Sequence, residues 1–80
     1  MIRIYIGNLS FNTTEENLKQ AFEEYGAVEE VSIVKDKFTG ASKGFGFVNM
    51  DDDAGFNAIR ALNGTMLDSR KIRVSQATNR

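Results

Sequence analysis

The strongest constraint on this fold is a two-residue repeat of apolar side chains that recurs in short segments. Isoleucine takes every second position from Ile2 to Ile6, and the run stops at Gly7. Such alternation predicts a β-strand with one buried face and one exposed face. The same reasoning predicts three further strands, at residues 28–35, 43–50 and 71–75.

Two segments between these strands repeat with the period of an α-helix instead. The first is expected to begin at a capping box formed by Thr13 and Glu16 and to close at Gly26. Its apolar residues recur three and four positions apart: Leu18, Ala21, Phe22 and Tyr25. The second helix is expected to follow the acidic run 51–53, which favours a helix amino end, and to stop at Asn63. Its inner residues are Ala58, Ile59 and Leu62.

The predicted order is strand, helix, strand, strand, helix, strand, all within one domain of residues 1–80. This is the split βαβ, or ferredoxin-like, arrangement (βαββαβ), an α+β fold. It has a four-stranded antiparallel sheet with both helices packed on one face. Right-handed crossovers place the first and third strands in the middle. One face of the sheet is therefore covered, and the other is open.

The composition excludes several kinds of chemistry. The chain contains no cysteine and no histidine, so it has no disulfide, no thiolate metal site and no histidine base. Its carboxylates fall at expected helix ends and exposed helix faces, and no P-loop spacing is present. We expect no enzyme activity, catalytic residue, cofactor, metal site or small-molecule substrate. No apolar run approaches the ~20 residues of a membrane span, and no signal peptide is evident, so we expect a cytoplasmic location. We also expect a monomer.

Alternation assigns nine residues to the covered face: Ile2, Ile4, Ile6, Val31, Ile33, Val48, Met50, Ile72 and Val74. The same parity places Tyr5, Phe45 and Phe47 on the open face, where side chains are normally polar. Each ring left in water forgoes roughly 1.5–3 kcal/mol of burial, so we expect a ligand to offset that loss. Flat rings framed by cations are suited to unstacked nucleobases and their phosphates.

The formal net charge of −1 conceals acidic and basic blocks. Residues 1–30 carry two basic and six acidic groups, whereas residues 60–80 carry five basic groups and one acidic group. Most glutamates lie in or beside the first predicted helix, on its expected outer surface. Such blocks favour two differently charged faces, whose local field steers a ligand better than the net charge suggests. The cations expected beside the rings are Arg3, Lys43, Lys71 and Arg73.

Two of the predicted strands also resemble signatures of the RNA recognition motif (RRM) family. Residues 43–50, Lys-Gly-Phe-Gly-Phe-Val-Asn-Met, resemble its octapeptide. Residues 4–9, Ile-Tyr-Ile-Gly-Asn-Leu, resemble its hexapeptide. The resemblance extends over residues 2–77 and includes the loop at 36–42. No glycine-rich tail precedes the end at Arg80, so we expect the chain to resemble the short single-domain bacterial members.

Carried onto these positions, the resemblance implies that Tyr5 and Phe45 each stack on a base. It implies that Phe47 packs against a sugar and that Lys43 neutralises a phosphate. The end of the last strand is implied to add contacts from Arg73, Ser75 and Gln76. The expected partner is single-stranded RNA, because paired bases cannot lie on the rings. The resemblance further implies a post-transcriptional regulator or an RNA chaperone.

Several positions depart from the family pattern or need a local explanation. Met50 replaces the usual aromatic residue of the octapeptide, and alternation assigns it to the core. Ser69 stands where glycine is common, which leaves the turn geometry open. Gly55 costs up to ~1 kcal/mol inside a helix unless close packing requires it. Gly44 and Gly46 are expected to make room for the helices on the covered face.

Other functions agree with the same pattern. One alternative is a protein-interaction module on this fold, although such relatives generally lack the sheet aromatics or cover them. Another is a single-stranded DNA binder, because stacking tolerates either sugar. Phe38 either makes a local loop contact, which we expect, or stacks on RNA. Phe56 either covers an edge of the core, which we expect, or anchors a protein partner.

Overall fold

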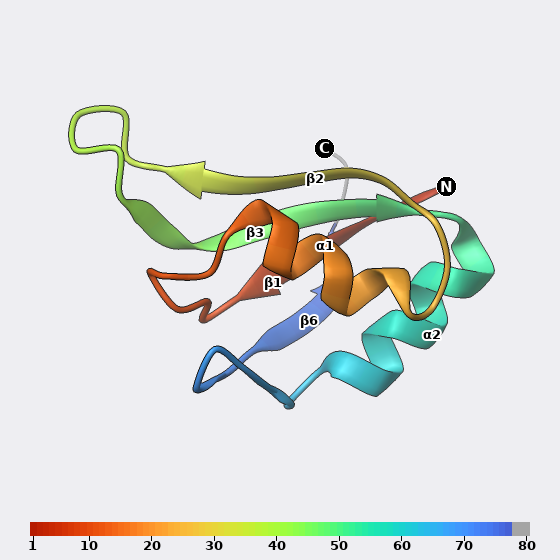
Figure 1. The fold of residues 1–80 in the computed structure, drawn as a ribbon. Coiled ribbons are helices and arrows are strands. Elements are labelled where there is room, and N and C mark those ends of the chain that lie inside the picture. Colours follow the sequence, from red (N-terminus) through yellow and green to blue (C-terminus); the bar gives the residue numbers. More distant parts are fainter. Residues whose placement is uncertain (78–80) are drawn as a thin grey trace.

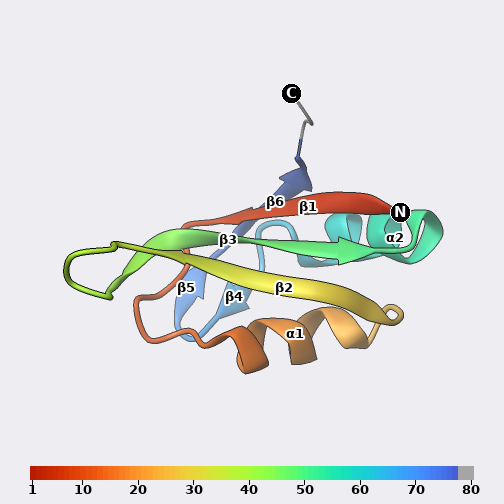
Figure 2. The ribbon, with the colours of Figure 1, turned by 90° about the horizontal axis from the view of Figure 1, so that it is seen from above.

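The computed structural model describes residues 1–77, and its elements follow the predicted order with one added hairpin. Figures 1 and 2 label them along the chain. The elements are β1 (Ile2–Gly7), α1 (Glu15–Glu23), β2 (Val28–Lys35), β3 (Ser42–Met50), α2 (Asp52–Leu62), β4 (Met66–Leu67), β5 (Arg70–Lys71) and β6 (Arg73–Gln76). Neither helix in residues 1–77 has the length and apolar character to cross a membrane.

Four strands form one antiparallel sheet in the order β2-β3-β1-β6, so β3 and β1 occupy its centre. Both helices lie on the same side of this sheet (Figure 2). The other side stays free of helices over the part of the chain that the structure describes. The predicted ferredoxin-like fold, with the first and third strands in the middle, is confirmed.

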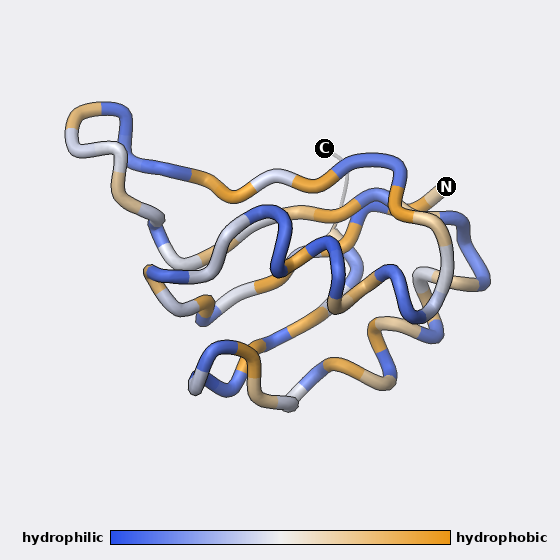
Figure 3. Tube along the Cα trace, in the orientation of Figure 1, coloured by the Kyte–Doolittle hydropathy of each residue, from blue (hydrophilic) through white to orange (hydrophobic). Residues whose placement is uncertain are grey.

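The core lies between the sheet and the helices. Eight of the nine residues assigned to the covered face are buried, and Val31 packs against them partly buried. Met50 is 0% exposed, which confirms that alternation places this octapeptide position in the core. The helices contribute Leu18, Phe22 and Ala58 to the same cluster. Figure 3 shows the underlying pattern, in which hydrophobic and hydrophilic residues alternate along the chain.

The start of α1 differs from the prediction by one residue. The N-cap is Thr14, whose hydroxyl accepts a hydrogen bond from the backbone N–H of Asn17 at 3.1 Å. Thr13 is buried and donates its hydroxyl to Asp68 Oδ2 at 2.7 Å. The predicted capping box of Thr13 and Glu16 is therefore wrong, because a tertiary contact to the β4–β5 turn occupies the Thr13 side chain.

The predicted last strand at residues 71–75 is divided in two. Its first part belongs to a short hairpin, in which β5 pairs with β4, and β6 alone joins the main sheet. The two residues between β4 and β5, Asp68 and Ser69, have φ values of +50° and +69°. Two consecutive left-handed residues form the turn that fits a tight hairpin. Ser69 therefore adopts this conformation without the glycine that is common there.

Close packing explains two of the glycines. A side chain at Gly46 would collide with the carbonyl oxygen of Ser32 and approach the Cα of Ile33 to 3.2 Å. The expectation that Gly46 makes room for a helix is wrong, because its close neighbour is the adjacent strand β2. A side chain at Gly55 would approach Ile2 Cδ1 to 2.6 Å. The contact of α2 with β1 therefore requires glycine, which offsets its low helix propensity.

Candidate nucleic-acid interface

The three rings predicted for the open face form one cluster on β1 and β3. Tyr5 pairs directly with Phe47 across the two strands, with ring centroids 5.9 Å apart. Phe45 lies 6.0 Å from Tyr5 and 6.2 Å from Phe47. These separations lie within the range of favourable aromatic contacts. Because the rings cover one another, each is only partly exposed, and the prediction that they are bare overstates their exposure.

The position of the Tyr5 ring depends on the absence of a side chain at Gly7. A Cβ at Gly7 would lie 2.6 Å from the Tyr5 hydroxyl and 2.9 Å from Cε2 of the ring. The two residues are two positions apart on one strand, so their side chains share a face. The phenol ring therefore extends over Gly7 along the sheet surface and presents a broad apolar area.

Arg3 supplies positive charge to the edge of the ring cluster. Its guanidinium carbon lies 4.3 Å from the centroid of the Phe47 ring, which is a cation–π contact. Within residues 1–77, the ion pairs join the amino terminus to Asp52 and Lys19 to Glu23. The guanidinium of Arg3 is thus held by a ring rather than by a carboxylate, and its N–H donors can be offered to a ligand.

Strand β6 extends the open face beyond Tyr5. Ser75 pairs with Tyr5, and Arg73 pairs with Gly7, so both side chains belong to the ring side of the sheet. Gln76 pairs with Ile4, whose side chain is buried beneath the helices. The alternation therefore assigns the Gln76 side chain to the covered side. The structure brings Arg73 and Ser75 to the ring face but does not bring the Gln76 side chain there.

The two predicted lysines are placed differently from each other. Lys43 is exposed in an irregular section of β3, next to Gly44 at a φ of +88°. A side chain at Gly44 would lie 3.6 Å from the carbonyl of Leu9, not against a helix, so that expectation is also wrong. Lys71 lies in β5, outside the main sheet. Its Cε would lie 3.8 Å from a Cβ atom at Gly64. Lys71 is therefore not part of the strand that carries Arg73.

The loop between β2 and β3 extends beyond the body of the fold (Figure 1). The Asp36 carboxylate accepts backbone hydrogen bonds from Thr39 at 3.1 Å and Phe38 at 2.8 Å. The hydrogen bond from Thr39, and then that from Phe38, lowers the pKa of Asp36. Phe38 is 88% exposed at this tip, with Lys37 Nζ 5.8 Å from its ring centroid. The Phe38 ring is thus almost fully exposed, and the local loop contact expected for it stays a prediction.

The structure adds a hydrogen-bonded polar pair beside the rings, and the sequence did not predict this pair as part of the site. The side-chain amide of Asn49 donates to Glu30 Oε1 at 3.1 Å. Both residues, together with Arg3, Ser32 and Phe47, line a small pocket on the open face. Glu30 lies within the strand predicted at residues 28–35, but it is not among the predicted site residues. Its alternation with Ser32 along β2 is the signal that identifies the correct face.

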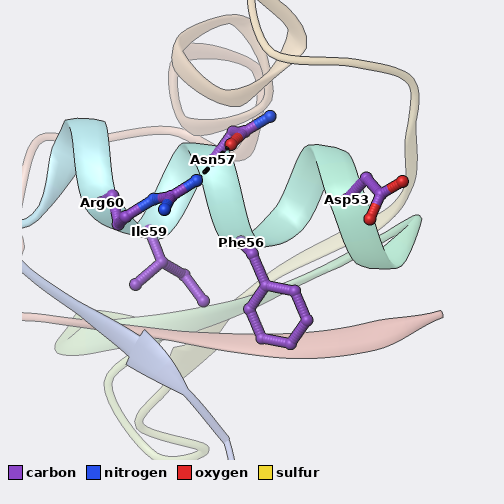
Figure 4. Close-up of a pocket in the computed structure, with 5 residues that line it drawn as sticks. All are labelled: Asp53, Phe56, Asn57, Ile59 and Arg60. Atoms are coloured by element: carbon purple, nitrogen blue, oxygen red, sulfur yellow. Dashed lines mark hydrogen bonds between the residues drawn. The ribbon is translucent and has the colours of Figure 1, made fainter.

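Another hollow lies on the flank of α2 (Figure 4). Phe56 and Ile59 point to one side of the helix there, while Arg60 donates to Asn57 Oδ1 at 2.6 Å. Phe56 is 43% exposed on this flank, and the expectation that it covers an edge of the core stays a prediction. Within residues 1–77, no three or more carboxylates are placed so that together they could hold a metal ion. This hollow belongs to the helical layer, whereas the rings lie on the opposite face of the sheet.

The strand order and the ring-bearing strands agree with a known family. The RNA recognition motif family matches residues 4–73. The chain belongs to this family. As an RRM, it is 47% identical over 79 residues to glycine-rich RNA-binding protein 1 of Mycosarcoma maydis, covering 98% of this chain and 45% of that protein. It spans about half the length of the curated relatives it matches.

Solved structures of other RRM proteins share the whole fold. The crystal structure of RNA-binding protein PG1 is 38% identical with a TM-score of 0.95, covering 100% of this chain and 98% of that one. The Rna15 RRM with bound RNA (GU) is 31% identical with a TM-score of 0.85, and the match covers 96% of this chain and 83% of that one. These relatives are named as RNA-binding proteins rather than as enzymes.

Proposed function

We propose that this RRM binds single-stranded RNA on the open face of its sheet. The observation that carries the proposal is the cluster of three rings, with centroids 5.9–6.2 Å apart, on the face opposite the helices. A solvated sheet face has no structural need for three large rings. Family membership adds support, because an RRM of the same fold is known with bound RNA.

In the proposed complex, Tyr5 and Phe45 each stack on a base, and Phe47 packs against the sugar between them. Arg73 and Lys43 hold phosphates at the two ends of the face. Each stacked base contributes roughly 1–3 kcal/mol, so two or three bases give an affinity around micromolar. Only a few cations lie near the rings, so the affinity falls less with salt than for a duplex binder.

The wider role is part of the same proposal. We place this chain among post-transcriptional regulators or RNA chaperones, acting as a monomer in the cytoplasm and without catalysis. The carboxylates of α1 and of the start of α2 are exposed on the helical layer. They repel phosphates from that layer, which favours approach of RNA to the ring face.

The location of the site is tested by NMR titration of the isotope-labelled chain with mixed-sequence heptanucleotides of RNA and of DNA. We expect shifts on the ring side of β1, β3 and β6, and tighter binding of RNA. Shifts confined to the helices would overturn the proposed site. Equal affinity for RNA and DNA would show that the chain binds single-stranded nucleic acids in general and does not prefer RNA.

The contribution of stacking is tested with Phe45→Ala. We expect RNA affinity to fall at least several-fold while the circular dichroism spectrum stays unchanged, because this ring lies outside the core. Phe56→Ala is the matched control, since it removes the same ring from the flank of α2. Equal RNA affinity for Phe45→Ala and the unaltered chain would contradict the stacking role.

A further inference from the structure

A row of three polar residues crosses the open face next to the ring cluster. Arg3 of β1 pairs with Asn49 of β3, and Asn49 pairs with Glu30 of β2. The neighbouring row contains Phe47 and Ser32, which pair with each other. Together these five residues line the small pocket beside the Phe47 ring. A nucleotide that follows the ring cluster toward β2 therefore reaches this polar row.

The hydrogen-bonding groups of this row are partly occupied and partly available. Asn49 donates to one carboxylate oxygen of Glu30, Oε1, at 3.1 Å. The exposed Glu30 carboxylate keeps acceptor sites on both oxygens, because an ionised carboxylate has about four lone-pair positions and only accepts hydrogen bonds. Arg3 is held over the Phe47 ring and only donates. The pocket thus combines an acceptor on β2 with a donor on β1.

We propose that this pocket selects guanine among the bases, an inference that rests on the proposed RNA binding at the ring face. On the Watson–Crick edge, guanine carries two neighbouring donors, N1–H and the N2 amino group. A carboxylate such as that of Glu30 accepts both donors side by side. Arg3 then donates to guanine O6, the acceptor on the same base edge.

The other bases fit the acceptor less well. Uracil, cytosine and adenine each place a single donor group beside an acceptor nitrogen or oxygen on the same edge. Against Glu30, that acceptor meets a carboxylate oxygen, and the two like partial charges repel. The carboxylate therefore favours guanine and disfavours its competitors, which is how binding sites achieve selectivity. It also explains why an acidic residue lies on a face that otherwise carries cations.

The test begins with the unaltered chain and three RNAs measured by fluorescence anisotropy. They are heptauridine, heptauridine with one central guanosine, and the same RNA with inosine, which lacks the 2-amino group. Uridines on both sides of the guanosine let the RNA shift along the sheet face until the guanine lies at the pocket. We expect the guanosine RNA to bind about ten-fold tighter than heptauridine, as for a good bidentate contact, with inosine between them.

Glu30→Gln then removes one acceptor oxygen and keeps the size of the side chain. We expect most of the guanosine preference to disappear, with affinity for heptauridine unchanged or slightly higher. Glu29→Gln is the matched control, because it removes the same charge one residue away and outside the pocket. It should keep the full preference.

Three results would overturn the inference. They are equal binding of guanosine RNA and heptauridine by the unaltered chain, no loss when inosine replaces guanosine, or a full preference in Glu30→Gln. In each of these cases RNA still binds, and the proposed function stands. If the unaltered chain binds none of the three RNAs, the proposed function fails and guanine selection fails with it.

Discussion

Alternate residues of the two central strands lie in different environments. Ile4 of β1 and Val48 of β3 are 0% exposed beneath the helices. Their chain neighbours Tyr5 and Phe47 are partly exposed on the other face, where the nearest rings lie about 6 Å away between centroids. The same two strands therefore carry a packed core on one side and, on the other, the ring cluster that we propose as the RNA-binding surface.

This difference separates stability from binding. A core side chain is surrounded on all sides, so its truncation leaves a cavity that the structure fills only in part. A ring on the open face contacts its neighbours at the edges and leaves its remaining surface available. Substitutions at neighbouring residues of one strand should thus have different consequences, and the following predictions test that separation.

The largest effect is expected for Ile4→Ala. This side chain is 0% exposed at the centre of the core, so its truncation should lower the free energy of unfolding by about 2–5 kcal/mol. Chemical denaturation followed by circular dichroism measures the change. Tyr5→Phe, at the next residue, serves as the control and should leave the unfolding midpoint nearly unchanged. A similar loss in both variants would show that the two faces are not separable.

A smaller effect is expected for Tyr5→Phe on RNA binding. The ring lies over Gly7, and stacking uses its face rather than its hydroxyl. Affinity for a mixed-sequence heptanucleotide, measured by fluorescence anisotropy, should therefore change by less than about two-fold. A loss comparable to that of Phe45→Ala would instead show that the hydroxyl makes an essential hydrogen bond to RNA.

The smallest effect concerns the β2–β3 loop, far from the core. Backbone hydrogen bonds from Thr39 and Phe38 lower the pKa of Asp36 below its ordinary value of 3.8. Because the folded pKa is the lower one, the charged carboxylate stabilises the loop above pH 3.8. This stabilisation is lost as the pH falls through the lowered pKa.

An NMR pH titration of the Phe38 and Thr39 amides measures this loss. The two amides should titrate together with a midpoint below 3.8, and Asp36→Asn should abolish that titration. The buried core of the sheet should keep its shifts over the same range. A midpoint at or above 3.8 would contradict the hydrogen-bonding role of the carboxylate.

The core and the ring face were predictable because each depends on local alternation. A strand residue that points inward implies that the next residue points outward, whatever the rest of the chain does. For that reason the predicted faces of Ile4 and Tyr5 are confirmed, as is the core position of Met50, where the family usually has an aromatic residue. Residues within a regular strand therefore lie on the face that the alternation predicts.

The predictions that are wrong concern positions that depend on distant partners. Thr13 does not cap α1 because Asp68, which lies 55 positions away, accepts its hydroxyl. Lys71 leaves the last strand because residues 66–67 pair with residues 70–71 in a hairpin.

By itself, the amino-acid sequence determined the order of the main strands and helices and the buried face of each strand. It also determined that three aromatic rings lie on the opposite face. These properties follow from residue periodicity within short segments. Only the tertiary structure decided which polar groups meet beside the rings. Glu30 and Asn49 are hydrogen-bonded because β2 pairs with β3 in one register, including an irregularity between Val28 and Glu30. Register is a property of two strands together, so one strand read alone does not reveal it.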